Sequence, residues 1–269
     1  MEVDERKSER LRNEVGSFRR RWPGGYCEGD PLDPVGRCSF DDLGYLSVLY
    51  VVYSYCIRPR VKGDIAVLEI GPGRGAWTRA LLGAREVWAL DAASAEDNGF
   101  WQHVGREWKD RVRYVQVSDF SCRELPDDHF DFLFSFGVFC HISWEGQQEY
   151  YRNLLPKMKR GAEAFVSYAD FDKYNAALRR ACQLRTWPLR GNPVTASLVG
   201  AARYVRNALR HGRTTWPAVE LEKGKPNHVC FHHAGVRETA RYLESVGWEV
   251  VEPDLNLTVR DPIVHCRKP

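Results

Sequence analysis

The stretch VLEIGPGRGAWTRALLGAREVWALDAAS, residues 67–94, constrains the fold of this chain more than any other part of its sequence. It reads as an apolar strand, a glycine-rich turn, a short helix, a second strand and an acid. Backbone N–H groups in such a turn face a ligand, and a side chain in place of a glycine would block its approach. Asp91, at the tip of the second strand, is placed to accept hydrogen bonds from a ribose diol. The stretch therefore predicts a nucleotide site.

Strands and helices alternate regularly around this stretch. The strongly apolar run FDFLFSFGVF is typical of a parallel strand that is covered on both faces. A helix and two closing strands are expected within 235–266. We therefore predict an α/β fold with a doubly wound, Rossmann-like sheet of seven strands. The first five strands are expected at 64–70, 86–91, 111–119, 130–139 and 162–170, with helices at 94–108 and 144–158 among the elements between them.

Two segments lie outside that alternation. Residues 1–63 are expected to form a helical N-terminal extension before a main domain at 64–269. Within the extension, the apolar run 43–57 is shorter than the roughly 20 residues that a bilayer span needs, so we expect core packing there, or a cover over the cofactor. Residues 171–227 are helix-compatible but supply no strand. An insertion of this length is usually functional, and we expect a lid over the acceptor.

The composition is that of a globular protein with reduced thiols. Hydrophobic residues make up 43% of the chain and charged residues 28%, which is ordinary for a globular domain. The net charge of +3 is too small to indicate a nucleic-acid partner. The eight cysteines form no C-x-x-C pair, and the charged N-terminus lacks the apolar segment of a signal peptide. We therefore expect a cytoplasmic protein without a disulfide framework.

The acid before the glycine turn distinguishes between two cofactor classes. The turn reads as G-x-G-x-x-A, which is typical of dinucleotide sites, and equally as Glu69 followed by glycines at every second position. A carboxylate aimed into the turn would repel a pyrophosphate. It can instead support the cationic methionine end of S-adenosylmethionine. A methyl donor is therefore favoured over a hydride carrier, and a dehydrogenase stays as an alternative.

The sequence resembles the class I S-adenosylmethionine-dependent methyltransferases over residues 64–170 and 228–268. LEIGPGRG resembles their first motif, ALDAAS their ribose-binding acid, VSDF their adenine-contacting turn and FDFLFSFGVFCHI their fourth-strand motif. The closing helix and two strands resemble the family's reversed terminal hairpin. In LLPKMKRGAEAFVSY the sequence KRGA stands where the family has a Pro-Gly turn, a departure that we expect to touch only a loop.

This resemblance implies S-adenosylmethionine as the cofactor and a set of residues that bind it. Glu69 and the three glycines of the turn would surround its methionine and sugar. Asp91 and Ala92 would hold the ribose hydroxyls, Asp119 and Phe120 would meet the adenine, and the end of the fourth strand would face the sulfonium. The cofactor-binding residues implied are Glu69, Gly71, Gly73, Gly75, Asp91, Ala92, Asp119, Phe120, Ser135 and Phe136.

Histidines after the fourth strand and before the last helix are candidates for proton transfer. If the acceptor is an alcohol, a base must take its proton, and histidine suits that role near neutral pH. His141 directly follows the fourth strand and is our first candidate. His232, in PNHVCFHHAGV, is the second. His228 of the same phrase, with Tyr168 and Asp170 at the end of the fifth strand, is expected to border the acceptor.

Two groups of potential metal ligands are weighed beside this chemistry. The histidines and the cysteine of PNHVCFHHAGV lack a second ligand pair at the usual zinc spacing. Asp170 and Asp172 could hold a magnesium ion together with a sugar diol, although a solvated turn is the simpler interpretation. We therefore expect no metal cofactor, with magnesium as the less favoured alternative.

The inserted segment carries charge of one sign. Between Lys173 and Val219 there is no acid and there are eight arginines. Such a run predicts a lid over a polar or anionic acceptor, and we expect O-methylation of a sugar or a specialised metabolite. The alternatives are a methyltransferase that docks RNA or protein on this segment, and a nucleotide-binding module without activity. No RNA-binding motif accompanies the arginines, so nucleic acid is less favoured. A homodimer is the assembly that we consider.

Overall fold

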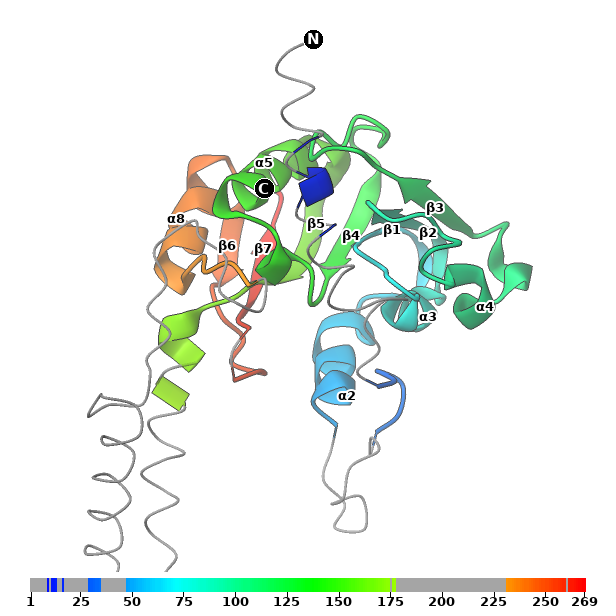
Figure 1. The fold of residues 1–269 in the computed structure, drawn as a ribbon, viewed down its shortest axis with the longest axis horizontal. Helices are drawn as coiled ribbons and strands as arrows, with labels where there is room; N and C mark the ends of the chain where they lie inside the picture. The colour runs from blue at the N-terminus through cyan, green and yellow to red at the C-terminus, as the bar shows by residue number, and fades with distance from the viewer. Residues whose placement is uncertain are drawn as a thin grey trace, which may run out of the picture.

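A seven-stranded sheet forms the middle of the molecule (Figure 1). The computed structural model describes residues 9, 11–13, 16, 29–34, 47–174, 176–177, 231–259 and 261–269. Most of the predicted insertion, and His228 with it, lies outside the described residues. The strands are β1 (Gly63–Ile70), β2 (Ala84–Asp91), β3 (Val112–Gln116), β4 (Phe130–Ser135), β5 (Met158–Ser167), β6 (Glu249–Glu252) and β7 (Ile263–Arg267).

The order of the strands is β3-β2-β1-β4-β5-β7-β6. Strands β1 to β5 run parallel to one another, whereas β7 pairs antiparallel with both β5 and β6. The chain steps outward from β1 to β3 and then returns to β4 on the other side of β1. This confirms the predicted doubly wound sheet and its reversed closing hairpin.

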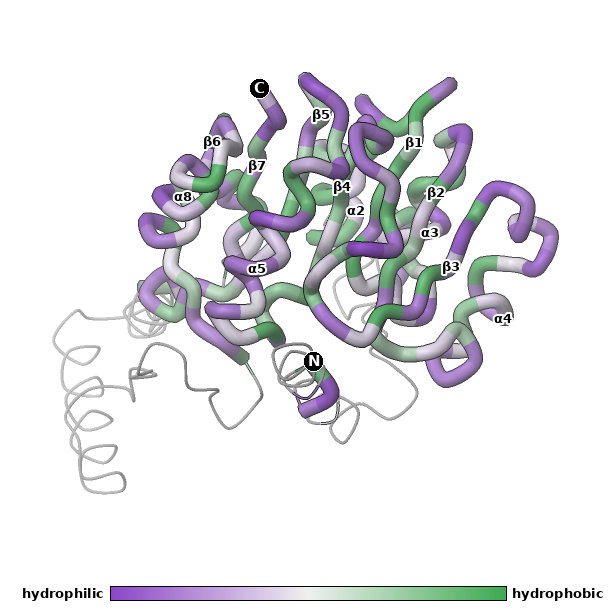
Figure 2. Tube along the Cα trace, turned by 90° about the horizontal axis from the view of Figure 1, so that it is seen from above, coloured by the Kyte–Doolittle hydropathy of each residue, from purple (hydrophilic) through white to green (hydrophobic). Residues whose placement is uncertain are grey.

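Two layers of helices cover the sheet (Figure 1). The helices α5 (Trp144–Leu154) and α8 (Val236–Ser245) pack on one face. The helices α2 (Val48–Val52), α3 (Ala76–Leu81) and α4 (Phe100–Val104) pack on the other. Because both faces are covered, the central strands are apolar along most of their length. Figure 2 shows this as hydrophobic strands enclosed by more hydrophilic turns.

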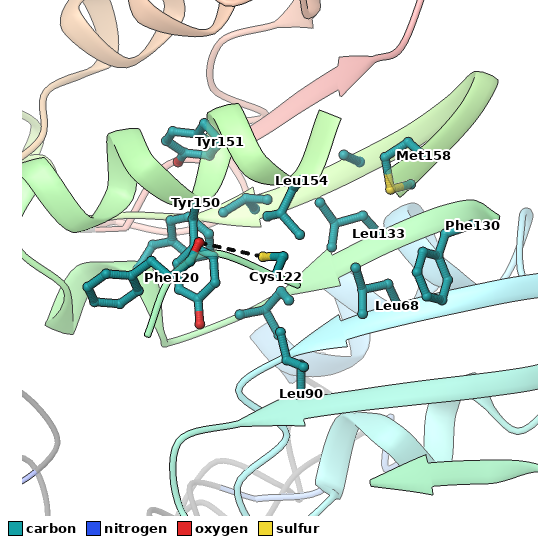
Figure 3. Packing of buried hydrophobic residues seen from close by; sticks show 14 of the residues in the cluster. Leu68, Leu90, Phe120, Cys122, Phe130, Leu133, Tyr150, Tyr151, Leu154 and Met158 are labelled. Carbon is teal, nitrogen blue, oxygen red and sulfur yellow. Dashed lines mark hydrogen bonds between the residues drawn. The ribbon is translucent and has the colours of Figure 1, made fainter. Parts of the chain in front are cut away.

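The core under α5 shows how the strands hold this layer. Leu154 of α5 lies beside Leu133 of β4, in the same buried cluster as Leu68 of β1, and Tyr150 of α5 lies beside Phe120 (Figure 3). The side chains of Leu68, Leu133 and Leu154 are at most 1% exposed. Burying one such side chain contributes about 1.5–3 kcal/mol. This packing positions α5, whose first turn lies beside the end of β4.

Within the apolar run 43–57, the described residues form α2 and a following π-helical turn, η2 (Tyr53–Ile57). Val52, Cys56 and Ile57 are fully buried in the core beside α3. The run therefore packs as core on the sheet, one of the two placements predicted, and its role as a cover stays a prediction. None of the helices in the described part of the chain combines the length and apolar character needed to cross a bilayer.

A clamp of charged and aromatic side chains fastens this segment to the sheet. The Nε of Arg60 donates to Glu163 of β5 at 2.7 Å, and the guanidinium lies 4.5 Å from the centre of the Phe165 ring. His265 of β7 stacks on the same ring at 4.3 Å. Its Nε2 lies 2.9 Å from the other oxygen of Glu163. The clamp therefore joins the N-terminal segment to two strands of the sheet.

Glycines explain three differences between the predicted and the observed elements. KRGA does not form a turn: it belongs to β5, where Gly161 takes a φ of 79° at a shift in the register with β4. The helix predicted at 94–108 is reduced to α4, which lies between Gly99 and Gly105, both with positive φ. The strand predicted at 130–139 ends at Ser135, because Gly137 turns the chain with a φ of 73°. Only glycine adopts these angles readily.

Candidate functional site

The carboxyl ends of four parallel strands meet at one edge of the sheet. Ile70 of β1 pairs with Leu90 of β2, and Asp91 at the end of β2 pairs with Gln116 at the end of β3. Ser135 ends β4 on the other side of β1. In sheets of this kind, ligands bind at the edge where the strand order reverses. The predicted cofactor residues, which come from four separate segments of the sequence, therefore gather at this edge.

Asp91 fastens the glycine turn to the end of β2. One carboxylate oxygen accepts a hydrogen bond from Gly73 N at 3.1 Å, and the other accepts one from Ala93 N at 2.8 Å. Gly71 N also donates to the carbonyl of Leu90 at 2.8 Å. Each carboxylate oxygen has a second lone pair, so Asp91 can hold the turn and still accept from a diol. Ala92, the next residue, is half-buried at the same edge.

The three glycines of the turn have positive φ angles of 71°, 53° and 89°. A Cβ at Gly71 would lie 2.2 Å from Val138, and one at Gly75 would lie 2.2 Å from Val104. A Cβ at Gly73 would meet nothing within 4 Å. Gly71 and Gly75 are therefore needed for packing, whereas at Gly73 no neighbouring side chain requires a glycine.

Glu69 is a buried acid beneath the turn. Its side chain is 2% exposed and accepts a hydrogen bond from Thr78 of α3 at 2.6 Å. Burial raises the pKa of Glu69 to about 8, and the negative charge of Asp91 adds to the rise. A cation bound nearby would favour the ionised carboxylate. This acid therefore fits the cationic methionine end of S-adenosylmethionine.

In the loop after β3, the side chain of Asp119 is held by hydrogen bonds, whereas the ring of Phe120 is packed in the core. Asp119 accepts a hydrogen bond from Ser121 N at 2.8 Å and forms an ion pair with Arg123. Burial acts to raise the pKa of Asp119, but these partners hold it below its usual value. The ring of Phe120 is fully buried against Tyr150 at 4.9 Å. The ring of Phe120 therefore belongs to the core, and the contact of this residue with an adenine stays a prediction for its backbone.

The end of β4 is fixed by hydroxyl groups. Ser135 is buried, and its Oγ donates to the carbonyl of Ile70 at 3.0 Å. Gly137 N donates to the Oγ of Ser167, at the end of β5, at 2.7 Å. Phe136 is half-buried, with its ring 5.0 Å from that of Trp77. The chain is thus held where β4 passes the glycine turn.

A turn after β4 carries the first candidate base. Val138, which lies against Gly71, leads into η4 (Phe139–His141). Gln147 of α5 is fully buried, and its Nε2 donates to the carbonyls of Phe139 and Ile142, each at 2.8 Å. These two carbonyls flank His141 in the sequence. Gln147 therefore holds the backbone on both sides of this histidine.

The second candidate base lies beside the same turn. His232 N donates to the carbonyl of Cys140 at 2.7 Å, and the side chain of His232 is buried with no hydrogen-bond partner at Nδ1. Burial lowers the pKa of His232, with a smaller opposing effect of Glu145. Its imidazole is therefore neutral near neutral pH and able to accept a proton. The ring of His141 lies 4.7 Å from that of Phe231.

The predicted acceptor residues divide into two groups. Tyr168 is fully buried, and its hydroxyl donates to the carbonyl of Pro253 at 2.8 Å. The ring of Tyr168 belongs to the buried core, and its place beside the acceptor stays a prediction. Asp170 is buried just beyond the end of β5, whereas His228 is outside the described residues.

Asp170, Asp172 and His233 place ligand atoms within 4.8 Å of one another. The oxygens of Asp170 accept from Lys173 N at 2.9 Å and Val236 N at 3.0 Å. The Nδ1 of His233 accepts from Phe171 N at 3.1 Å, so a neutral ring carries its proton on Nε2. A metal at the Nδ1 of His233 would have to displace the hydrogen bond from Phe171 N, whereas each oxygen of Asp170 keeps a second lone pair. The cluster is better explained as the fastening of α8 to the end of β5.

Sequence reasoning missed the residues that support the site. Thr78, Val138 and Gln147 act through a hydrogen bond or a contact with a residue that is distant in the sequence. Nothing in their local sequence marks them. Phe231 had a weak signal, since it stands directly before His232 in the phrase already selected.

The comparisons with known proteins agree with this geometry. Residues 68–166 match the family model described as a methyltransferase domain. No curated protein matches the chain. An S-adenosylmethionine-dependent methyltransferase from Mesorhizobium loti is 19% identical over 82% of this chain and 98% of its own, with a TM-score of 0.54. The 1,6-didemethyltoxoflavin-N1-methyltransferase from Burkholderia thailandensis, solved with S-adenosylhomocysteine, is 15% identical over 82% of this chain and 78% of its own, with a TM-score of 0.51.

Alanine substitutions should separate the packing glycines from the ligand-facing one. Gly75→Ala combines a left-handed backbone with a clash, and should cost about 2 kcal/mol or more of unfolding free energy. Gly73→Ala should cost only about 1 kcal/mol, yet should weaken the binding of S-adenosylhomocysteine. Urea denaturation and calorimetry measure the two effects. Wild-type affinity in Gly73→Ala would show that this space is not used by the cofactor.

Because the pKa of Glu69 is raised, the free energy of unfolding should decrease as the pH rises. The unfolded carboxyl titrates near 4.5 and the folded one near 8, so between these values the folded state holds a proton that the unfolded state has lost. The free energy of unfolding is therefore highest below the pKa of the unfolded carboxyl and decreases as the pH rises towards the pKa of the folded one. Relative to wild type, Glu69→Gln should gain stability progressively between about pH 5 and pH 8, up to on the order of 5 kcal/mol.

Thermal unfolding across this pH range, without cofactor, provides the measurement. Glu244→Gln changes an exposed carboxyl of α8 and serves as the matched control. An identical pH dependence in wild type and Glu69→Gln would show that Glu69 is already ionised in the free protein.

Proposed function

We propose that this chain is a class I S-adenosylmethionine-dependent methyltransferase and that it methylates a hydroxyl oxygen of a small polar acceptor such as a sugar or a specialised metabolite. The observation that carries the proposal is the neighbourhood of two histidines at the end of β4. His141 lies on η4, and His232 is bonded through its backbone to Cys140 of the same turn. Imidazole nitrogens beside a methyl-donor site suit the removal of a proton from an alcohol.

The cofactor is expected to lie across the carboxyl ends of β1 to β4. In this proposal Glu69 and the glycine turn hold its methionine part, Asp91 accepts from the ribose, and Asp119 lies near the adenine. Ser135 and Phe136 face its sulfur. When bound, S-adenosylmethionine supplies an electrophilic methyl group. The space beside Gly73 and the buried acid Glu69 both support this placement.

The chain's own residues then have to orient the acceptor and take its proton. We assign the proton to an imidazole nitrogen of His141, with His232 as the second candidate. Gln147 keeps the backbone around His141 fixed, so the ring is positioned before the acceptor arrives. Such orientation can supply a large part of a rate enhancement.

The same proposal assigns a place to the other segments. Residues 64–269 form the catalytic domain, with residues 1–63 as an extension and residues 171–227 as a lid over the acceptor. The cysteines Cys56, Cys122, Cys140 and Cys266 are free and buried, which fits a reducing cytoplasm. The arginines of the lid would meet a polar or anionic acceptor.

The test follows a labelled methyl group. Each reaction contains the enzyme, S-adenosylmethionine labelled in its methyl group, and one fraction of a cell extract. The three fractions are small molecules, RNA and protein. The label should enter the small-molecule fraction. His141→Ala should still bind S-adenosylhomocysteine but should lose about 10²–10⁴-fold in turnover, as expected for a general base.

His129→Ala is the matched control, because His129 pairs with Glu86 near the opposite ends of the strands and should keep full turnover. His232→Ala tests the second candidate in the same way. Label in RNA or protein alone would overturn the acceptor class. Full turnover in both His141→Ala and His232→Ala would overturn the histidine base.

A further inference from the structure

A third cluster of apolar residues lies beside the candidate bases, separate from the two cores that flank the sheet. Its buried members are Cys140, Ala169 and Phe171. Phe231 and Tyr174 pack against them and are half-buried. The cluster thus joins the turn after β4, the end of β5 and the segment before α8. This is the side of the sheet edge on which the acceptor is expected.

Backbone hydrogen bonds hold these three segments together. His232 N donates to the carbonyl of Cys140 at 2.7 Å, and Ala234 N donates to the carbonyl of Ala169 at 3.0 Å. Ala169 and His233 also form a parallel bridge. Phe231, which directly precedes this ladder, is therefore held in place at the edge of the sheet.

The ring of Phe231 lies beside a candidate base. Its centre is 4.7 Å from that of His141, and the two rings are inclined by 32°. Both side chains are half-buried. An aromatic surface that is partly exposed next to a proton acceptor offers a flat apolar contact to one more ring. Such ring pairs contribute about 0.5–1.5 kcal/mol beyond the area that they bury.

The polar groups beside this surface are engaged in holding the backbone. Both oxygens of Asp170 accept from backbone amides, and so does the Nδ1 of His233. The amide nitrogen of Gln147 donates to two carbonyls. Asp172 is exposed. Among the described residues, each oxygen of Asp170 keeps one further lone pair and the Nδ1 of the buried His232 has no hydrogen-bond partner, so few groups remain for the several hydroxyls of a sugar. The surface is better suited to a ring.

We infer that the acceptor carries its hydroxyl on a planar aromatic or heteroaromatic ring, and that this ring packs against Phe231 beside His141. The inference rests on the proposed function and narrows its acceptor class. A phenolic hydroxyl there would lie next to the imidazole that takes its proton. Phe231 is then a residue that determines acceptor specificity without taking part in proton transfer.

The experiment compares two compounds that both carry neighbouring hydroxyls but differ in their ring. Catechol is aromatic and methyl β-glucopyranoside is a saturated sugar, and each carries neighbouring hydroxyls. Each is titrated into the full-length protein saturated with S-adenosylhomocysteine, and binding is followed by saturation-transfer NMR of the ligand. The variants are Phe231→Leu, which removes the ring while keeping an apolar side chain, and Tyr55→Leu. Tyr55 is an aromatic residue of η2 that is 50% exposed, and it controls for unspecific ring contacts.

The wild type and Tyr55→Leu should bind catechol in preference to the glucoside. Phe231→Leu should bind catechol about 3- to 10-fold more weakly while keeping its affinity for S-adenosylhomocysteine. Equal catechol binding in Phe231→Leu and the wild type, or preference for the glucoside, would overturn the inference. Those results would leave the proposed small acceptor intact, whereas label found only in RNA or protein would remove the proposed function itself.

Discussion

The carboxylate of Asp91 is the interaction on which the rest of the site depends. It accepts from Gly73 N and Ala93 N, so it joins the glycine turn after β1 to the loop after β2. The positive φ angles of the turn then allow Gly71 to approach Val138 and Gly75 to approach Val104. A single acid thus joins the first two strand ends, and a Cβ at Gly73 of the turn would meet no atom within 4 Å.

From the glycine turn, contacts continue to the acceptor side. Val138 lies against Gly71 and begins the turn that carries His141. Gln147 fixes that turn from α5, and the carbonyl of Cys140 accepts from His232. The donor and acceptor halves of the proposed site are therefore connected by direct contacts. We expect a substitution in the glycine turn to affect the positions of the histidines as well.

Much of this could be predicted from the sequence, because the strands and the glycine turn follow local patterns. The sheet order, Glu69, the turn and Asp91 all lie in stretches where periodicity and glycine spacing have one clear interpretation. The direction of a side chain was harder to predict. Phe120 and Tyr168 are the expected residue types at the expected strand ends, yet their rings are fully buried. The role of Gln147 depends on the fold of α5 against β4, which no local pattern reveals.

Calorimetric titration of S-adenosylhomocysteine into the wild type and Asp91→Asn tests the central claim most directly. Asparagine keeps the size of the side chain and one acceptor oxygen but removes the charge. The affinity of Asp91→Asn should fall about 10-fold or more, as expected for lost hydrogen bonds to a charged group, while circular dichroism shows the same folded state. No heat of binding in the wild type, or an unchanged affinity in Asp91→Asn, would contradict a cofactor site organised by this carboxylate.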